Sequence, residues 1–499
     1  MTTVSPAVGD VAVMRLPISG YGACQVAGTD GNGVTAYALA WESADIPALP
    51  QLAGVPPLTL DHHAHPRGPA RIGIAGDQLP PPGWRWLGNL PVPAAMSGEI
   101  NSYSSWSWLT IQITEQRRWD RYLPAAAKEA YRRGATRGQV DIDLGLGPVT
   151  LGAATGHLDL TGAGPLSPPP TGPVRWAALG LLARCTSLTW TGPDRGLVAA
   201  LTDHPIVHDL TWTDAPRHLD LRGTGLTSLS VRGTIDLLQL PDHLTALHLM
   251  AGARIGTVSA AGDGRWLRMT VIDPGPGERL PAGLGQVRDL RQVGRGTISA
   301  APLSELRQLE ELWLSWRGGP GELDDAAALG ELTRLAHLTM NDAYGIDAGT
   351  LPELPALSAL TVHGLRRTVA AALKARYRGT GVRVDVTGAK NDTWLAANLT
   401  NPFRDWADDD PRGGAAACKA YAAAVRSVDA LAKQAPDHGG GAEAVLRRLV
   451  EQLNRIDARY RIIDTVRREE AGDAFAGLAV RAGVSDGQAD DWFDEWRDF

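Results

Sequence analysis

The chain has 499 residues with a formal net charge of −7, and 44% of the residues are hydrophobic. A chain of this length usually divides into domains of about 100–200 residues, so we expect about three domains. Acidic and basic residues number 10 and 10 in residues 1–135, 26 and 24 in 136–393, and 19 and 14 in 394–499. No segment has the basic excess of a protein that binds a phosphate backbone, so nucleic acid is not an expected partner.

The cysteines and the apolar runs indicate the compartment. Cys24, Cys185 and Cys418 are far apart and form no CxxC pair, so neither a disulfide framework nor a cysteine zinc site is expected. The first ten residues lack the basic and apolar regions of a signal peptide. No window approaches the roughly 18 uninterrupted apolar residues of a membrane span. We therefore expect a cytoplasmic protein with no membrane span.

Residues 1–135 are predicted to form a mainly-β domain. Five apolar runs bounded by Gly and Pro turns are predicted as strands: Val11–Leu16, Ala23–Ala27, Val34–Trp41, Arg71–Ala75 and Gly83–Leu90. The stretch 106–113 alternates as a strand does, with a bulge expected between Trp108 and Leu109. Leu123–Arg133 has the composition of a helix that ends at Gly134.

Several short motifs of this domain resemble one known family. They are Gly9-Asp10-Val11, Leu16-Pro17, Gly20-Tyr21-Gly22-x-x-Gln25-Val26 and Trp86-Leu87-Gly88-Asn89-Leu90-Pro91. They are similar to motifs of the immunity protein family 26, whose members are inferred to neutralise toxins of polymorphic systems by binding them. The resemblance is confined to the N-terminal domain, and it implies a protein-binding module without catalytic residues.

From about residue 140 to 390, a leucine-x-apolar triplet recurs. It begins at Leu188, Leu210, Leu229, Leu247, Met269, Leu312, Leu338 and Leu360, and Leu290 is taken as the start of one imperfect unit. Successive triplets are 22, 19, 18, 22, 21, 22, 26 and 22 residues apart. This repeat resembles the leucine-rich repeat, whose unit has about 20–29 residues. Residues 136–393 are therefore predicted to form a solenoid in which each unit buries its leucines against its neighbours.

The repeats differ from the leucine-rich-repeat family in one respect, and the sequence after them predicts a unit that ends the array. Most units lack the asparagine or cysteine that usually follows the strand, and Asn341 is the clearest exception. Leu158 and Leu219 are interpreted as degenerate or short units. The helix-like run 366–377 and the strand-like run 382–386 are predicted to be the C-terminal closing unit.

Residues 394–499 are predicted to form an α-helical domain. The predicted helices are Ala415–Ala435, Ala442–Ile456, Ile463–Ala482 and one that follows a capping box at Ser485–Gln488. Pro436 and the glycines 439–441 are expected to separate the first two. Trp492, Trp496 and Phe499 share one face of the last helix, which would dock within this bundle or on the solenoid. The chain is thus predicted to be an α/β multidomain protein: a solenoid between a mainly-β domain and a helical bundle.

No motif in the sequence specifies a catalytic, cofactor or metal site. His62, His63 and His65 lie in a proline-rich loop without a cysteine or an HExxH motif nearby, so a polar loop and no metal are expected. The acidic residues 469, 470 and 473 follow two arginines at 467 and 468, which is typical of a solvent-exposed helix face. The glycine-rich stretches lack the lysine and the spacing of phosphate-binding loops, and no GxSxG elbow is present, so no cofactor is expected.

The predicted binding surface is the concave face of the solenoid. In a leucine-rich repeat, strand residues between and beside the consensus leucines point to this face. The predicted partner-binding residues are Arg232, His248, Arg268, Glu311, Trp313, His337, Thr339, Asn341 and His363. Tryptophan and arginine are enriched in the energetic centres of protein interfaces, so the centre is expected around Arg268, Glu311 and Trp313.

The predicted function is therefore that of a non-enzymatic adaptor or scaffold that recognises a protein partner, with a toxin as one candidate. The alternative is an enzyme whose site lies in the β or helical domain, with repeats that select its substrate. A pocket where several titratable groups converge would favour this alternative.

Overall fold

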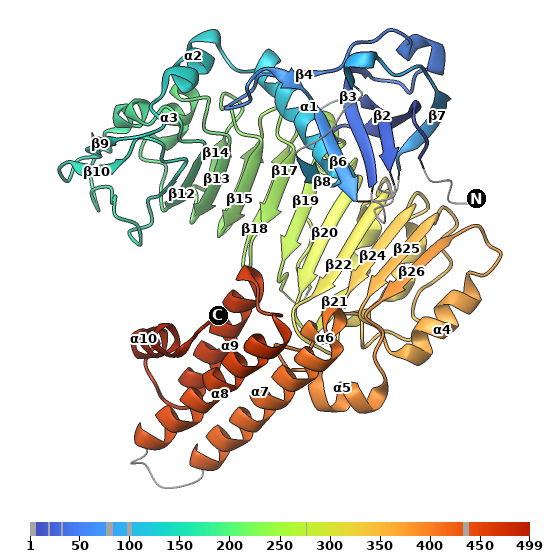
Figure 1. Ribbon diagram of the computed structural model, residues 1–499. Helices are drawn as coiled ribbons and strands as arrows, with labels where there is room; N and C mark the ends of the chain where they lie inside the picture. The colour runs from blue at the N-terminus through green and yellow to red at the C-terminus, as the bar shows by residue number, and fades with distance from the viewer. Residues whose placement is uncertain are drawn as a thin grey trace.

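A computed structural model of the chain describes residues 6–17, 20–30, 33–75, 83–96, 102–275, 277–432 and 439–499. The structure is of the mixed α/β type, and its centre is an 11-stranded parallel sheet (Figure 1). A smaller N-terminal sheet and a group of C-terminal helices lie against opposite ends of the parallel strands.

The N-terminal sheet has six strands in the order β7-β1-β2-β3-β6-β8. Their bounds are β1 (Asp10–Arg15), β2 (Tyr21–Asp30), β3 (Gly33–Ser43), β6 (Arg71–Ala75), β7 (Arg85–Asn89) and β8 (Tyr103–Ser104). All five predicted strands are present, and β2 pairs antiparallel with both β1 and β3. Two short strands, β4 (Thr59–Leu60) and β5 (Gly68–Pro69), pair with each other beside this sheet.

The predicted strand at residues 106–113 is wrong, because this stretch begins helix α1 (Trp106–Arg121). Trp106, Leu109 and Ile113 are buried at helical spacings of three and four residues, and they pack against the N-terminal sheet. Strand alternation would have buried Ile111 together with Leu109 and Ile113, yet the Ile111 side chain is 55% exposed. The expected bulge is therefore absent. Helix α2 (Ala125–Arg133) follows where a helix was predicted.

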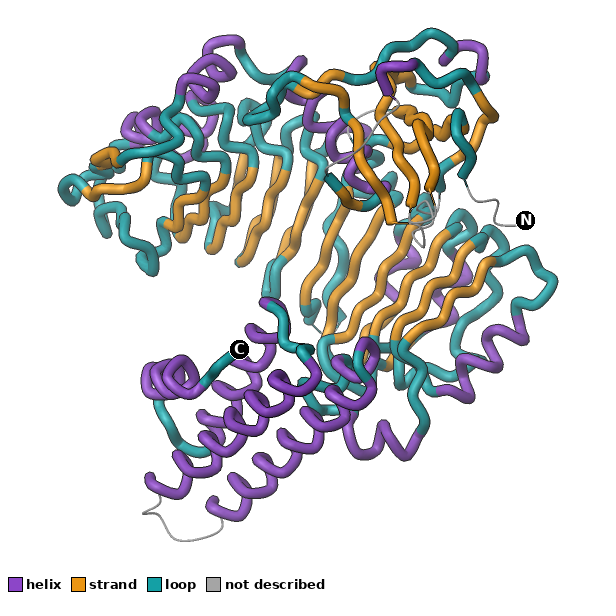
Figure 2. Tube along the Cα trace, in the orientation of Figure 1, coloured by secondary structure: helices purple, strands orange, loops and turns teal. Residues whose placement is uncertain are grey.

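The parallel sheet contains a strand at each of the nine repeat triplets (Figure 2). The nine strands are β12 (Ser187–Thr191), β13 (Asp209–Thr213), β15 (Ser228–Arg232), β17 (Ala246–Leu249), β19 (Arg268–Ile272), β20 (Asp289–Gly294), β22 (Glu311–Trp316), β24 (His337–Asn341) and β25 (Ala359–His363). β11 (His157–Asp159) precedes them at one edge, and β26 (Arg383–Thr387) follows at the other.

Each triplet leucine lies beside the equivalent residue of the next strand, so the first triplet positions form one ladder. All nine of these side chains are at most 2% exposed, and they belong to a single buried cluster. The continuous core that the spacing predicted is therefore present. A row of apolar residues two positions later in every one of these strands except β20, such as Trp190, Trp212 and Leu314, extends the same core.

The two irregular leucines behave differently from each other. Leu158 lies in β11 and pairs with Leu188, so it is part of the parallel sheet. Leu219 lies in β14 (His218–Asp220), which belongs to a separate three-stranded sheet with β16 (Thr234–Gln239) and β18 (Arg254–Ser259). Its interpretation as a repeat unit is wrong, because the Leu-x-Leu fragment here lies in the segment that connects β13 to β15.

The remaining connections are short strands and helices. They comprise the hairpin β9 (Gln139–Ile142) with β10 (Val149–Gly152), the pair β21 (Thr297–Ser299) and β23 (Glu322–Asp324), and helix α3 (Leu197–Asp203). As predicted, helix α4 (Arg367–Arg376) and β26 close the sheet at its C-terminal edge.

The C-terminal part is helical, with a buried core of its own. Its helices are α5 (Asp392–Asn398), α6 (Trp406–Asp409), α7 (Pro411–Ala432), α8 (Gly439–Tyr460), α9 (Thr465–Arg481) and α10 (Asp486–Trp496). The expected break at Pro436 lies outside the described residues. The glycines 439–441 do not lie between the two helices, because they form the first turn of α8. Ser485 occupies the N-cap position of α10, but its side chain makes no capping hydrogen bond, so the capping box is wrong.

None of the helices in the described ranges is long and apolar enough to cross a membrane.

Candidate functional site

The exposed side of the parallel sheet carries two rows of polar and aromatic side chains. We call this side the open face, because alternate strand residues point away from the leucine core. The first row runs along neighbouring strands from Arg268 through Asp289 and Glu311 to His337. The second row consists of His248, Thr270, Arg291, Trp313, Thr339 and Thr361.

The central residues of the open face interact with one another. Arg268 Nε donates a hydrogen bond of 2.7 Å to Asp289 Oδ2. The guanidinium of Arg291 lies 5.0 Å from the ring centre of Trp313, in the range of a cation–π contact. Asp289 and Glu311 are neighbours in the first row, so two carboxylates lie between Arg268 and His337. Arg291 and Trp313 lie beside them in the second row.

Electrostatics keeps this group charged. Burial lowers the pKa of Arg268, but the carboxylates of Asp289 and Glu311 raise it more, so its net shift is upward. Burial raises the pKa of Glu311, but the nearby His337 and Arg268 reverse the effect, so its pKa lies below the usual range. Both side chains therefore stay ionised at neutral pH and can form ion pairs with an approaching molecule.

Trp313 is the most prominent apolar group on this face. Its side chain is 37% exposed, whereas its neighbours Leu312 and Leu314 are buried in the core. The aromatic residues of the last helix do not cover it: the rings of Trp492 and Trp496 stack on each other at 5.1 Å and pack against the helical core. Of the two docking sites considered for the last helix, the bundle itself is the one observed.

The N-terminal part of the chain packs against the amino-end flank of the sheet, which we define as the residues that directly precede the repeat strands. Arg15 donates a 2.5 Å hydrogen bond to the carbonyl of Arg265, and its guanidinium lies 5.4 Å from the ring centre of Trp266. Tyr122 stacks on His243 with ring centres 4.6 Å apart. The same flank therefore contacts two segments of the N-terminal part that are far apart in sequence.

Arg118 is the most deeply buried group at this flank, with a side chain that is 1% exposed. Its Nη2 atom donates hydrogen bonds to the carbonyls of Gly225 at 3.1 Å and Pro205 at 3.5 Å, and its Nη1 atom lies 3.6 Å from Glu115 Oε2. Burial lowers the pKa of Arg118 to about 10, which still leaves the guanidinium charged at neutral pH.

The C-terminal helices pack against the carboxyl-end flank, the residues at or after the ends of the last strands. Arg404 forms an ion pair of 2.5 Å with Asp342, and both side chains are largely buried. Asp408 lies between Lys390 and His363, which are its two ion-pair partners. Ion pairs therefore dominate this second junction.

The structure places the sequence-predicted binding residues in three environments. Arg268, Glu311, Trp313, His337, Thr339 and His248 lie together in the two rows. His363 lies at the carboxyl-end flank, where it contacts Thr387 and Asp408, so the helical part occupies it. Arg232 and Asn341 are the last residues of β15 and β24, and they lie at the margin of the open face.

Asp289 and Arg291 are central to the site, but they were not among the predicted partner-binding residues. Their unit lacks a regular triplet, because Gln292 stands where the other units have an apolar residue. The signal that could have found them is the spacing, since Leu290 falls 21 residues after Met269 and 22 before Leu312. That register assigns both flanking residues to the open face.

The residues that carry the immunity-family resemblance have a structural role. Gln25 Nε2 donates a 2.7 Å hydrogen bond to the carbonyl of Leu90, and Asn89 Nδ2 donates one of 2.7 Å to the carbonyl of Val8. A Cβ atom at Gly9 would lie 2.5 Å from Asn89 Oδ1, which explains the glycine. These contacts hold β1, β2 and β7 together, and they identify no partner surface.

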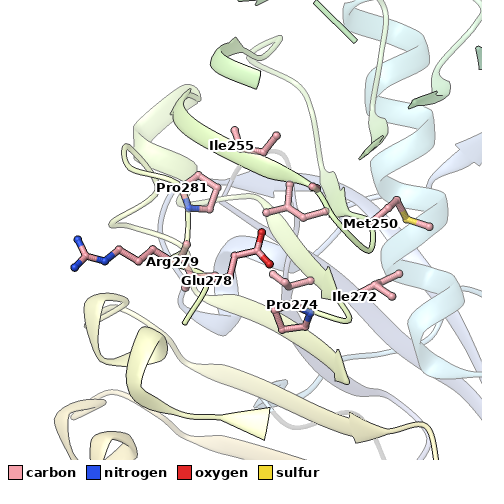
Figure 3. A pocket seen from close by; sticks show the side chains of 11 residues that line it. Met250, Ile255, Ile272, Pro274, Glu278, Arg279 and Pro281 are labelled. Carbon is pink, nitrogen blue, oxygen red and sulfur yellow. The ribbon is translucent and has the colours of Figure 1, made fainter. Parts of the chain in front are cut away.

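One pocket lies at the carboxyl ends of β17 and β19, and its lining is mostly apolar (Figure 3). Glu278 and Arg279 are its titratable residues. The Glu278 carboxylate accepts a 2.6 Å hydrogen bond from the backbone N–H of Gly275, and the Arg279 guanidinium points away from the pocket. Titratable groups therefore do not converge in this pocket.

The acidic residues considered on α9 are exposed, as expected for a solvent face. Glu470 has one specific partner, because its Oε2 atom accepts a 2.7 Å hydrogen bond from the indole of Trp406.

Comparisons with known proteins give little further information. No family model matches the chain, and no curated protein matches it either. The resemblance to immunity proteins therefore has no support from family models. Among solved structures, an internalin from Listeria monocytogenes aligns with 43% of this chain and 71% of its own, at 15% identity and a TM-score of 0.23. A TM-score this low does not establish a common fold.

Proposed function

We propose that the chain is a leucine-rich-repeat solenoid protein that binds a protein partner through the open face of its parallel sheet and catalyses no reaction. The single observation that carries the proposal is the group around Trp313. An exposed tryptophan under a guanidinium, beside charged side chains of both signs, has the composition of an interface centre. None of these side chains belongs to the buried leucine core.

The position of the group on the molecule supports the same proposal. The N-terminal part covers the amino-end flank, and the helices cover the carboxyl-end flank. Gly83 even reaches the edge of the first row, where a Cβ atom would lie 3.3 Å from His337 Cε1. A partner that enters between these two flanks would contact Arg268, Arg291 and Trp313 directly.

A narrower version of the proposal makes the partner a toxin and the chain an immunity protein. It rests only on the sequence motifs of the N-terminal domain, which serve the β sheet itself. We propose that, if the narrower version holds, the toxin binds at the open face, because the motif residues are occupied by internal hydrogen bonds.

Site-specific crosslinking tests the proposal. A photoreactive phenylalanine analogue in place of Trp313 is expected to capture a protein in the native cell. The same analogue in place of Thr211, which lies on the open face of β13, should capture much less of it. Arg268→Glu and Arg291→Glu together should abolish capture at position 313, whereas Arg217→Glu, an exposed change outside the face, should not.

Two outcomes would contradict the proposal. Equal capture at positions 211 and 313 would mean that the aromatic and charged group is not the centre of an interface. Capture that survives the two charge reversals would mean that the group does not contribute to affinity.

A further inference from the structure

Three metal-ligating side chains from separate elements converge where the N-terminal part meets the parallel sheet. His63 lies in the loop between β4 and β5, Glu115 lies in α1, and His208 directly precedes β13. All three are partly buried, and their ligand atoms lie within 4.8 Å of one another. We propose that His63, Glu115 and His208 bind one divalent transition-metal ion, such as Zn²⁺, that links the N-terminal part to the repeat sheet.

A chain of hydrogen bonds prepares His63 to be a ligand. His62 Nε2 lies 2.8 Å from Gln112 Oε1, and since a carbonyl oxygen only accepts, this nitrogen carries the proton. Neutral His62 then accepts at Nδ1, which is 2.9 Å from Nδ1 of His63. The proton of His63 is therefore on Nδ1, and its Nε2 atom has a free lone pair. Metal-bound histidines commonly have their other nitrogen fixed in this manner.

The atoms that would face the ion are buried and make no hydrogen bonds within the described part of the chain, although Glu115 Oε2 lies 3.6 Å from Arg118 Nη1. Nε2 of His63 and Oε2 of Glu115 are both inaccessible to solvent, and neither has a hydrogen-bond partner among the described residues. A bound cation would satisfy both.

The donor set indicates the class of ion. Two imidazole nitrogens and one carboxylate oxygen are a known zinc-binding combination, with a fourth position left for water or another ligand. Calcium and magnesium prefer oxygen ligands and are disfavoured by two histidines. In a tetrahedral zinc site, ligand atoms lie about 3.3 Å apart, so the side chains would close by roughly an ångström on binding.

Arg118 is the main group that opposes an ion here. Its guanidinium lies 3.6 Å from Glu115 and is buried, so it competes with a cation for the carboxylate. One feature offsets this competition: the guanidinium also donates to the carbonyls of Pro205 and Gly225. A fourth ligand of negative charge, such as hydroxide, would reduce the repulsion further.

The competing explanation of the cluster is aromatic packing alone. The ring of His63 lies 5.0 Å from Trp119, 5.3 Å from Tyr131 and 5.6 Å from His208, measured between ring centres. Such contacts could by themselves join the two regions. The two explanations differ in one measurable respect, because only the first requires an ion.

No metal was expected from the sequence, because the three loop histidines were weighed together as one possible site. In the structure these histidines have different neighbours. His62 forms a hydrogen bond with Gln112. His63 lies near Glu115 and His208, which are 52 and 145 residues further along the chain. The proposal replaces that expectation.

Direct binding measurements test the proposal. The full chain is freed of metal with a chelator, equilibrated with Zn²⁺ and desalted. We expect inductively coupled plasma mass spectrometry to find one zinc per chain. Co²⁺ in its place should give the strong visible absorption of a four-coordinate site. Gln112→Ala is expected to weaken zinc binding about 10- to 100-fold, because it releases the hydrogen-bond chain that orients His63.

Matched histidine variants complete the test. His63→Ala and His208→Ala should lose the zinc, whereas His65→Ala, in the same loop, and His243→Ala, at the same flank, should keep it. Metal-free thermal unfolding of each variant shows whether it folds. A wild-type chain that retains no zinc would overturn the proposal and leave aromatic packing as the explanation. Retention of one zinc by both His63→Ala and His208→Ala would overturn it as well.

Discussion

The N-terminal part and the C-terminal helices both pack against the parallel sheet, but different interactions hold them. At the amino-end flank, Arg118 donates to backbone carbonyls, and Tyr122 stacks on His243. At the carboxyl-end flank, the contacts are side-chain ion pairs, chiefly Arg404 with Asp342. Stacked rings and carbonyl bonds depend little on ionic strength, whereas ion pairs depend on salt and on the protonation of each carboxylate. The two junctions should therefore respond differently to mutation and to pH.

The largest effect is expected from Arg118→Leu. The substitution removes two hydrogen bonds to carbonyls and leaves the buried carboxylate of Glu115 without its cation. Breaking a buried ion pair from one side costs about 3–5 kcal/mol, and we expect a loss of that size in the free energy of unfolding by urea.

Arg121→Leu is the control for this prediction. Arg121 lies on the same helix and pairs with Glu42, but its side chain is 46% exposed. Exposed ion pairs contribute about 0–1 kcal/mol, so this variant should lose little. Similar losses in the two variants would show that Arg118 does not hold the amino-end flank.

A smaller effect is expected from Arg404→Leu at the carboxyl-end flank. The variant loses the ion pair with Asp342 and the hydrogen bond to the carbonyl of Leu399. Because burial already raises the pKa of Asp342 to about 6, its carboxylate can take up a proton when the arginine is gone. We therefore expect a loss of about 2–3 kcal/mol, below that of Arg118→Leu. Arg412→Leu, on an exposed part of α7, should change the free energy of unfolding by less than about 0.5 kcal/mol.

The response to pH should have opposite signs at the two flanks. Burial and the nearby Arg118 lower the pKa of His243 to about 4, despite Asp242. The folded-state pKa lies below the unfolded value of about 6.5, so unfolding takes up a proton in this window. The contribution of His243 is therefore complete above pH 6.5 and is lost as the pH falls towards 4.

Asp342 shows the reverse dependence. Burial raises its pKa from 3.8 to about 6, assisted by Asp405 and opposed by Arg404 and His363. The folded state therefore holds a proton that the unfolded state has lost. The contribution is complete below pH 3.8 and is lost as the pH rises through 6.

The paired variants His243→Gln and Asp342→Asn measure these two dependences. Between pH 7 and pH 5, each should change the pH dependence of the free energy of unfolding by about 1–2 kcal/mol, in opposite directions. If both variants shift it in the same direction, the pKa of one of the two groups is not displaced as described.

Much of the fold was predictable because leucine spacing reports burial directly. Every unit that buries a leucine against its neighbour must repeat that leucine, so Leu188 and Leu312 mark their strands without further information. Helix α1 was missed because β-branched and aromatic residues between 106 and 113 favour a strand, and only the exposure of Ile111 reveals the helical period. Tertiary packing overrode the local preference there.

The candidate site was predictable only in part, for a related reason. Register assigned Glu311 and Trp313 to the open face, since alternation along a strand is local. The covering of the two flanks depends on contacts between distant segments, such as Arg118 with Gly225. No pattern in a single sequence encodes such a pair, so the loss of His363 to the helical part was not foreseeable.

The smallest effect on stability is expected from Trp313→Ala, and this variant separates the open face from both flanks. Trp313 contacts Arg291 but lies outside the leucine core, and its side chain is already 37% exposed. A cation–π contact at an exposed site contributes about 0.5–1 kcal/mol, so the free energy of unfolding should fall by about that amount.

The neighbouring residue supplies the comparison for Trp313. Leu312 is 2% exposed, and Leu312→Ala should cost about 2–5 kcal/mol because it leaves a cavity in the core. If Trp313→Ala destabilises the chain as much as Leu312→Ala does, Trp313 supports the fold and its exposure needs no partner. If instead Trp313→Ala leaves unfolding nearly unchanged but removes a bound protein, the large exposed ring serves recognition. The pair of variants, one residue apart on opposite sides of the same strand, thus distinguishes the face that folds the protein from the face proposed to bind.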